Sequence, residues 1–301
     1  MARIPSPIEQ IHDPLFEEKG LEVWIKRDDL IHPHIMGNKW RKLKYNILHV
    51  RESHLAGIVT FGGAYSNHIA ATAAACAANQ LPSIGIIRGD ELSPDSNPTL
   101  RFASDQGMKL QFVSRNEYRQ LKENHHQLQQ THPGYLILPE GGTNELAIRG
   151  CQEIWTEINQ SFDYAITSVG TGGTMAGLLK AMSGEGKLIG ISALKGNFIH
   201  SEFRNMLQHY NIPFENYELM DQWHFGGYGK VTDGLVTFIN DTKEKIKVLF
   251  DPIYTAKMYF AVTKLIETNY FPSNSKIVLI HTGGLQGIAG FIEKQKKNIL
   301  L

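Results

Sequence analysis

Four cationic side chains lie within ten residues near the start of the chain, in the segment MGNKWRKLKY. They are Lys39, Arg41, Lys42 and Lys44. A lysine amine can attack a carbonyl group only when it is unprotonated, and neighbouring cations or burial lower its pKa. The same cluster is also typical of a solvated basic helix face. The segment alone therefore leaves two interpretations open, a surface patch or one reactive lysine.

Lys39 differs from the other three cations in the residues that precede it. The pair Gly37-Asn38 is typical of a helix start, and we expect Asn38 to be the N-cap, which puts Lys39 in the first turn. The positive end of the helix dipole disfavours an ammonium group there. Lys39 is therefore the candidate reactive amine, and the cations that follow it become its electrostatic surroundings.

Three segments share a pattern in which a Val- and Ile-rich strand ends in glycines and a helix follows at once. Their sequences are TFGGAYSNH (60–68), SVGTGGTMAG (168–177) and IHTGGLQG (280–287). Glycine allows a sharp turn and close approach to a ligand, and the following helix presents free N–H groups. Such turns can also serve only to turn the chain, and Ser66 and Thr282 could be simple caps. Three of them together favour ligand binding at one edge of a sheet.

The middle turn offers the most specific chemistry, because it combines consecutive amides with two hydroxyl groups. It contains Gly170, Thr171, Gly172, Gly173 and Thr174. It does not match the dinucleotide pattern GxGxxG, and no Lys-Ser/Thr pair follows as in a Walker A loop. A single phosphate monoester fits this turn better than a pyrophosphate. A reactive lysine together with a monophosphate site meets the requirements of pyridoxal 5′-phosphate.

The composition limits the classes of protein that this chain can belong to. It has 301 residues, of which 42% are hydrophobic, and its formal net charge is zero. This balance disfavours a nucleic-acid partner. Two cysteines cannot supply a disulfide framework or a four-ligand zinc site, and His32 and His34 lack the spacing of a helical metal site. We therefore expect a cytoplasmic globular protein with no metal and no membrane partner.

Short apolar runs rich in Val and Ile alternate with helix-period segments along nearly the whole chain. Examples are AGIVTF before HIAATAAACAANQ and SKIVLIHTGG before LQGIAGFIEK. This alternation predicts an α/β fold in which parallel strands are covered by helices on both faces. At least six such units exceed one comfortable sheet, so we expect two sheets in two lobes.

Six motifs, in their order along the chain, resemble the family of D-cysteine desulfhydrase and 1-aminocyclopropane-1-carboxylate deaminase. They are KRDDLIHPHIMGNKWRKLKY, TFGGAYSNH, SVGTGGTMAGL, FGGYGK, FDPIYTAKM and LIHTGG. The resemblance runs from about residue 8 to about residue 292. It implies a fold-type II pyridoxal-phosphate enzyme related to the tryptophan synthase β chain, usually a homodimer. It also implies a large cofactor-anchoring lobe (1–41 and 151–301) and a smaller inserted lobe (42–150).

The resemblance also implies roles for individual residues toward the substrate. Lys39 is similar to the lysine that forms the Schiff base with the cofactor and then moves the α-proton. Ser66 is similar to the serine that holds the substrate carboxylate or assists proton transfer. Tyr228 and Tyr254 are similar to the two tyrosines that face the substrate.

Further positions are implied to contact the cofactor. Asn67 resembles the asparagine beside the ring hydroxyl, and Thr282 a threonine near the pyridine nitrogen. The residues Gly170 to Thr174 resemble the phosphate loop.

Two positions depart from the family pattern and bear on the substrate. Thr255 stands where the ring-opening deaminases carry Glu, and a threonine can only share a hydrogen bond with the pyridine nitrogen. Tyr65 stands where the desulfhydrases have Gln, and we expect its ring to border the carboxylate pocket. Thr255 is the desulfhydrase-like residue.

The function that follows is a deaminating lyase acting on a small amino acid, by desulfhydrase-like α,β-elimination to a keto acid and ammonia. One alternative is 1-aminocyclopropane-1-carboxylate deaminase, which opens the ring to α-ketobutyrate. Another is a phosphometabolite-binding protein without catalysis.

Overall fold

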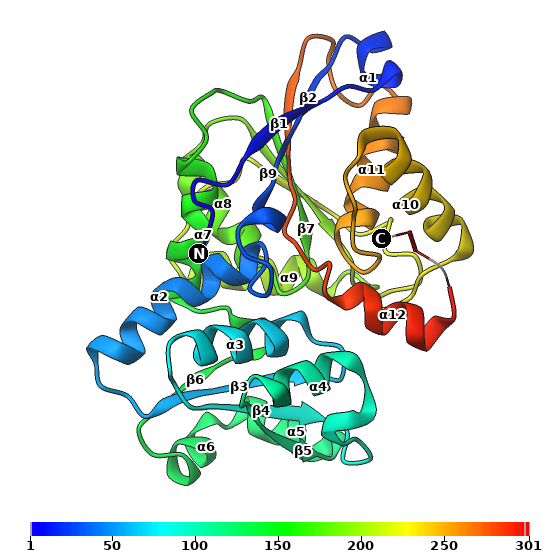
Figure 1. Cartoon of the computed structure of the whole chain (residues 1–301). Helices are drawn as coiled ribbons and strands as arrows, with labels where there is room; N and C mark the ends of the chain where they lie inside the picture. Colours follow the sequence, from blue (N-terminus) through cyan, green and yellow to red (C-terminus); the bar gives the residue numbers. More distant parts are fainter. Residues whose placement is uncertain (1, 298, 301) are drawn as a thin grey trace.

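The computed structural model describes residues 2–297 and 299–300 and contains two β-sheets (Figure 1). The larger sheet has six strands in the order β1-β2-β10-β7-β8-β9. All neighbours pair in parallel except β1 and β2. The strands are β1 (Ile8–Ile11), β2 (Glu22–Lys26), β10 (Lys276–Ile280), β7 (Tyr164–Val169), β8 (Lys187–Ser192) and β9 (Tyr217–Met220).

The smaller sheet has four strands, all parallel, in the order β5-β4-β3-β6. They are β3 (Gly57–Gly63), β4 (Ser83–Arg88), β5 (Lys109–Val113) and β6 (Tyr135–Leu138). β3 and β4 are almost fully buried, as the continuous apolar runs of a parallel sheet require.

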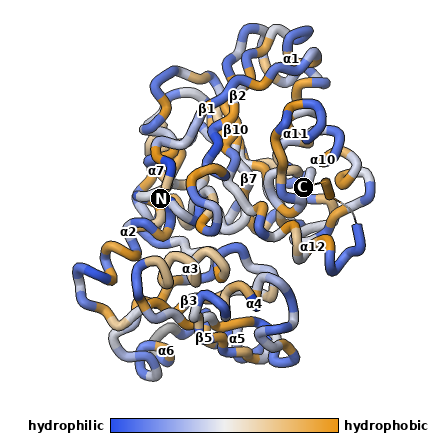
Figure 2. Tube along the Cα trace, viewed as in Figure 1, coloured by the Kyte–Doolittle hydropathy of each residue, from blue (hydrophilic) through white to orange (hydrophobic). Residues whose placement is uncertain are grey.

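Helices cover both faces of each sheet, which confirms the predicted α/β fold. On the large sheet, one buried cluster joins the strands to α1 (Pro14–Glu18), α10 (Asp233–Ile246), α11 (Thr255–Glu267) and α12 (Gly287–Gln295). The opposite face packs on α7 (Glu145–Thr156), α8 (Gly173–Met182) and α9 (Phe198–His209). Figure 2 shows that the hydrophobic residues concentrate in the strands and packed helices.

On the small sheet, α2 (Asn38–Glu52), α3 (Asn67–Ala78) and α4 (Pro98–Asp105) pack on one face. The other face packs on α5 (Arg115–Glu123) and α6 (His125–Thr131). The described residues also form the short 3₁₀ helices η1 (Asp28–Leu30), η2 (Pro94–Ser96) and η3 (Glu140–Gly142). Among the described residues, no helix combines the length and apolar character needed to cross a bilayer.

Two helices connect the sheets and cross the predicted lobe boundaries. α2 spans the boundary at 41/42 and α7 the one at 150/151. The two helices touch closely, since a Cβ atom placed on Gly150 would lie 1.9 Å from the carbonyl oxygen of Arg41. All four strands of the small sheet lie inside the predicted inserted segment, while the boundaries themselves stay predictions.

Candidate active site

The three glycine-rich turns follow β3, β7 and β10. The turn after β10 contacts the start of α2 and the start of α3. A Cβ atom placed on Gly37 would lie 2.0 Å from the carbonyl oxygen of Thr282, and Gly37 has φ = +59°. Only glycine tolerates both conditions. On the other side, the amide of Asn67 lies against Gly284 and Gly287. The turn after β10 therefore holds the start of α2 next to the start of α3.

Helix α2 begins at Asn38, with Gly37 as its N-cap and no side-chain cap. The expectation that Asn38 caps this helix is therefore wrong, although Lys39 does lie in the first turn. The reason is a contact distant in sequence, because Gly37 takes its left-handed backbone against the carbonyl of Thr282. The Asn38 side chain is freed for another role. Its Nδ2 donates to Oγ1 of Thr174 at 2.8 Å, and its Oδ1 accepts from Nζ of Lys39 at 2.9 Å.

Lys39 is half-buried in this turn, and the pKa of its amine is lowered to about 7. The largest cause is burial, which disfavours the charged form. The nearby ammonium of Lys42 lowers the pKa further, while the carboxylate of Asp251 acts in the opposite direction. A substantial fraction of the Lys39 amine is therefore unprotonated at neutral pH, as a nucleophile or general base requires.

The turn after β7 has the form of an anion site at a helix N-terminus. Gly172 is the N-cap of α8 with φ = +84°, and Gly173 and Thr174 form the buried first turn. This backbone leaves free N–H groups at the positive end of the helix dipole. A Cβ atom placed on Gly173 would lie 2.5 Å from Oγ1 of Thr143, so only glycine fits there.

Lys42 is a site residue whose individual role the sequence did not predict. Its buried Nζ donates to the carbonyl oxygen of Gly141 at 2.9 Å and to Oγ1 of Thr143 at 3.0 Å. Oγ1 of Thr143 in turn lies 3.1 Å from Oγ1 of Thr171. Lys42 thus connects the segment after β6 to the turn after β7 and supplies a positive charge beside it.

Tyr254 and Tyr228 come from two distant segments, and their rings lie beside each other. The ring centroids are 5.9 Å apart, and the ring planes are tilted by 60°. The Tyr254 ring lies against Gly170, where an added Cβ atom would be 3.0 Å from Cε1. Burial raises the pKa of both phenols, so both stay protonated at neutral pH.

Lys257 fixes the segment that carries Tyr228. Its fully buried Nζ donates to the carbonyl oxygens of His224 and Gly227, each at 2.9 Å. The residues from Phe225 to Gly227 all have positive φ, so these two bonds hold an unusual backbone in place. The sequence analysis did not identify Lys257. Its position three residues after Tyr254 on one helix is the only signal that could have suggested it.

Thr255 is buried with its hydroxyl fully engaged by Asp251. Its Oγ1 donates to Oδ1 of Asp251 at 2.7 Å and accepts from the backbone N–H of Asp251 at 2.8 Å. Asp251 also accepts from the amides of the next turn, which opens α11. The predicted contact between Thr255 and a cofactor nitrogen stays a prediction.

Oγ1 of Thr282 lies 3.1 Å from Oγ of Ser168 at the ends of two adjacent strands.

The segment after β3 contains the helix cap Ser66 and the nearby residues Tyr65 and His68. Ser66 is the N-cap of α3 and accepts from the amide of Ile69 at 3.3 Å. The ring of Tyr65 lies against Gly290 of α12, with Nζ of Lys294 4.9 Å from its centre. His68 is buried, and burial lowers the pKa of its imidazole well below the usual value. His68 is therefore neutral.

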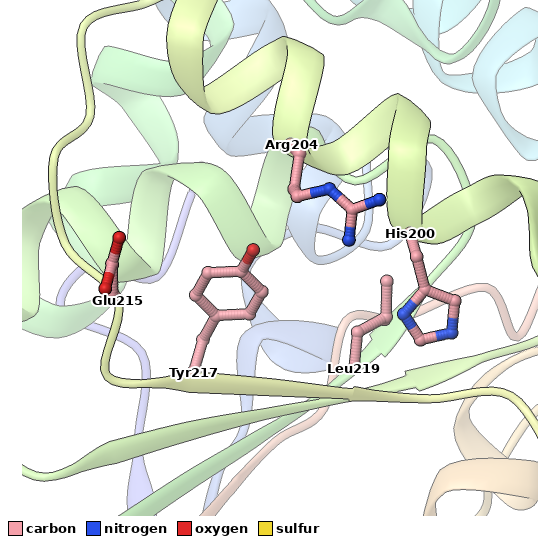
Figure 3. Close-up of a pocket in the computed structure, with 5 residues that line it drawn as sticks. All are labelled: His200, Arg204, Glu215, Tyr217 and Leu219. Atoms are coloured by element: carbon pink, nitrogen blue, oxygen red, sulfur yellow. The ribbon is translucent and has the colours of Figure 1, made fainter.

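A separate surface cavity of about 290 Å³ lies between α9 and the edge strand β9 (Figure 3). It is lined by His200, Arg204, Glu215, Tyr217 and Leu219, and contains none of the predicted site residues. Within the described part of the chain, no three metal-ligating side chains of the His, Cys, Asp or Glu type gather as a metal site would require.

The donor set between the turns fits pyridoxal 5′-phosphate. The N-terminus of α8 suits one phosphate group. The Lys39 amine, which is partly unprotonated at neutral pH, is connected to this helix through the side chain of Asn38. The glycines in these turns let side chains from other segments, such as Thr143 and Tyr254, approach the backbone of the anion-binding turn closely. Lys39, Asn38, Thr174 and the residues of the turn would therefore hold the cofactor, and Asn67 and Thr282 lie at the neighbouring strand ends.

The chain matches the family model described as "Pyridoxal-phosphate dependent enzyme" over residues 2–283. It is 27% identical to the mitochondrial "Bifunctional D-cysteine desulfhydrase/1-aminocyclopropane-1-carboxylate deaminase" of Arabidopsis thaliana, covering 96% of this chain and 78% of that protein. It is 24% identical to a "D-cysteine desulfhydrase" of Klebsiella pneumoniae, covering 95% and 94%.

Among solved structures, the chain is similar to an "ACC deaminase homologue", with a TM-score of 0.85 and 25% identity over 97% of this chain and 93% of that one. These findings confirm the predicted fold type, the predicted cofactor and the resemblance derived from the six motifs. The family match covers more than nine-tenths of the sequence, and the chain belongs to the family of pyridoxal-phosphate dependent enzymes.

Proposed function

We propose that the chain is a deaminating lyase that eliminates a β-substituent from a small amino acid and releases a keto acid and ammonia. The observation that carries the proposal is the Lys39 amine, whose pKa is lowered to about 7 and which is joined through Asn38 to the anion-binding turn. The names of the Arabidopsis and Klebsiella relatives support the same reaction class.

When bound, pyridoxal phosphate supplies an electron-withdrawing ring that stabilises negative charge at the substrate α-carbon. The chain's own residues supply positioning and proton transfer. In the proposal, the neutral Lys39 amine accepts the α-proton, and Ser66 and Asn67 orient the substrate from the start of α3. Ser66 can offer its hydroxyl proton to a carboxylate because its oxygen already accepts from Ile69.

Tyr228 and Tyr254 are proposed to face the departing group. Both phenols are protonated at neutral pH, because burial raises their pKa, and each can donate a proton or a hydrogen bond. The two rings also exclude water from one side of the site, since Tyr254 packs directly on Gly170. Of the two, Tyr228 is the more exposed, at 50%, and is proposed to contact the substrate side chain.

Ring opening of 1-aminocyclopropane-1-carboxylate is the second candidate, favoured by the names of the Arabidopsis relative and of the similar solved structure. Thr255 argues against it, because this position carries a threonine and not the Glu of the ring-opening deaminases, and the Thr255 hydroxyl already donates to Asp251. A binding protein without catalysis would explain the anion site but not the lowered pKa of Lys39.

A panel of D- and L-amino acids with β-leaving groups, together with 1-aminocyclopropane-1-carboxylate, tests the proposal. Release of pyruvate and ammonia from the β-substituted substrates supports elimination. Release of α-ketobutyrate from the cyclic substrate decides for ring opening instead. Absence of any keto acid from the loaded enzyme contradicts both. The homodimer and the cytoplasmic location stay predictions, and sedimentation of the purified protein tests the first.

A further inference from the structure

The carboxyl edge of the small sheet presents two charged side chains on either side of a glycine. β3 lies between β4 and β6, and the three strands run parallel. β4 ends at Arg88, which is in register with Gly63 at the end of β3. β6 ends at Leu138, and Glu140 follows two residues later. Arg88 and Glu140 therefore flank the glycine turn that leads into Ser66.

The Arg88 guanidinium lies beside Gly63, at ordinary contact distance from where a Cβ atom there would be. A Cβ atom placed on Gly63 would lie 3.5 Å from Nη2 of Arg88. The guanidinium lies 5.6 Å from the ring centre of Tyr118, which is only 3% exposed and packs edge-on against Phe61. This buried ring is a fixed platform beneath the cation.

Arg88 is exposed and forms no ion pair in the part of the chain that the structure describes. Its acidic neighbour Glu140 is already paired with Lys122, in a bond from Nζ to Oε2. Arg88 and Lys122 lie over the same Tyr118 ring, at 5.6 and 6.0 Å from its centre, so in the group formed by Arg88, Lys122 and Glu140 the Arg88 charge is the one left without an ion pair among the described residues. Such a group favours a ligand that brings an anion.

This charged group lies next to the predicted site residues. Gly141, directly after Glu140, touches Thr171 of the anion-binding turn, since a Cβ atom there would lie 2.8 Å from Cγ2. On the side of the large sheet, the Tyr254 ring lies against Gly170 of the same anion-binding turn, with the Tyr228 ring 5.9 Å from it. The carboxyl edge of the small sheet, where Arg88 ends β4, therefore meets the anion-binding turn on which the tyrosine rings pack.

We propose that Arg88 determines substrate specificity by binding an anionic group at the end of the substrate side chain, such as a phosphate or a carboxylate. The inference rests on the proposed function and narrows its substrate class to small amino acids with a negatively charged β-substituent. Arg88 lies outside the groups that hold the cofactor or move the proton. It is thus expected to act on the affinity for such substrates and not on the reaction itself.

The test compares O-phosphoserine with β-chloroalanine, both enantiomers of each, because elimination from either gives pyruvate and ammonia and one assay serves both. Arg88→Met removes the charge and keeps most of the stem, and Arg88→Lys restores the charge. Arg101→Met, which changes an exposed arginine on α4, is the matched control. In addition, calorimetry measures the dissociation constants of aspartate and alanine with the loaded enzyme.

We expect Arg88→Met to lower kcat/KM for O-phosphoserine by about tenfold to a hundredfold, the loss of one hydrogen-bonded charge pair. The same variant should change kcat/KM for β-chloroalanine less than about twofold, because an exposed charge contributes little free energy to a neutral substrate. Arg88→Lys should recover part of the loss, and Arg101→Met should resemble the unchanged enzyme. Aspartate should have a lower dissociation constant than alanine, and Arg88→Met should remove this difference between the two dissociation constants.

Equal effects of Arg88→Met on both substrates, or no effect on either, would overturn the inference while leaving the proposed lyase function intact. Conversely, if no amino acid is turned over but Arg88→Met still weakens aspartate binding selectively, the lyase proposal fails and the role of Arg88 stands.

Discussion

The side-chain nitrogen of Lys39 donates a 2.9 Å hydrogen bond to Oδ1 of Asn38. Nδ2 of the same amide donates to Thr174, so one side chain connects the candidate amine to the anion-binding turn. This connection fixes where a phosphate and a reactive aldehyde would lie relative to each other.

Asn38→Ala should therefore weaken cofactor binding. Loss of two hydrogen bonds is expected to raise the dissociation constant for pyridoxal phosphate about tenfold or more, measured by absorbance titration of the apo-protein. Asn79→Ala, at the C-terminal end of α3, is the control and should bind the cofactor normally. An unchanged dissociation constant for Asn38→Ala would show that the bridge does not hold the cofactor.

The lowered pKa of Lys39 predicts a pH dependence of cofactor uptake. Covalent uptake needs the neutral amine, so its rate should rise with pH around a midpoint of about 7. Because the Lys42 ammonium lowers the Lys39 pKa, Lys42→Met should raise that pKa and move the midpoint to higher pH. Stopped-flow absorbance measures the rate.

Lys44→Met provides the comparison, since Lys44 is exposed and pairs with Glu153. Its midpoint should stay near that of the unchanged protein. A midpoint that is the same for Lys42→Met would contradict the electrostatic role assigned to Lys42.

The sequence predicted the alternation of strands and helices, the three glycine-rich turns between them and the first-turn position of Lys39, because these features are encoded in local patterns. It did not predict the roles of Asn38, Asp251 or Lys257. Each depends on a partner far along the chain, such as Thr174 for Asn38 and Gly227 for Lys257. Hydrophobic periodicity and helix-capping patterns describe residues that are close in sequence. They therefore do not predict contacts between separate turns.

The cap at α2 illustrates the same limit. Asn38 was expected to cap the helix because its residue type suits that position. The contact of Gly37 with Thr282 moves the helix start by one residue and turns the asparagine toward the anion site.

Lys257 should act on Tyr228 through the backbone. Lys257→Met keeps a similar volume but removes both hydrogen bonds to the carbonyls of His224 and Gly227. We expect kcat/KM to fall about tenfold to a hundredfold, with the cofactor affinity unchanged, because the segment with Tyr228 loosens. Kinetics and limited proteolysis of this segment measure the two effects.

The surface residue Lys264, which pairs with Glu267, serves as the reference position. Lys264→Met should leave kinetics and proteolysis unchanged. If Lys257→Met behaves in the same way, Tyr228 is held by other contacts and the positioning role of Lys257 is wrong.

Glu157 joins a buried group of charges that connects the end of α7 to α2 and β2. It accepts from the Arg41 guanidinium and from Nζ of Lys26, while Arg41 also pairs with Asp28. Although burial raises the pKa of Glu157, its cationic partners lower it more, to about 2. The resulting stability is therefore fully present above the usual glutamate pKa and is lost as the pH falls toward 2.

Glu157→Gln should lower the free energy of unfolding by about 3–5 kcal/mol at pH 7, since it leaves the buried Lys26 ammonium without a carboxylate and removes one carboxylate from Arg41. Urea unfolding between pH 7 and pH 3 should also show a weaker dependence on pH for this variant. Glu267→Gln, which breaks an exposed pair, should cost less than about 1 kcal/mol. Equal effects of the two substitutions would rule out a stabilising role of the buried group.

The measurement that tests the central claim most directly is borohydride reduction of the loaded protein, followed by peptide mass analysis. Reduction fixes the cofactor on the lysine to which it is bound. The account predicts a pyridoxyl group on the peptide that contains Lys39 and on no other, and no labelling of Lys39→Ala, while Lys44→Ala is labelled as before. A label on another lysine, or no label on the unchanged protein, would contradict it.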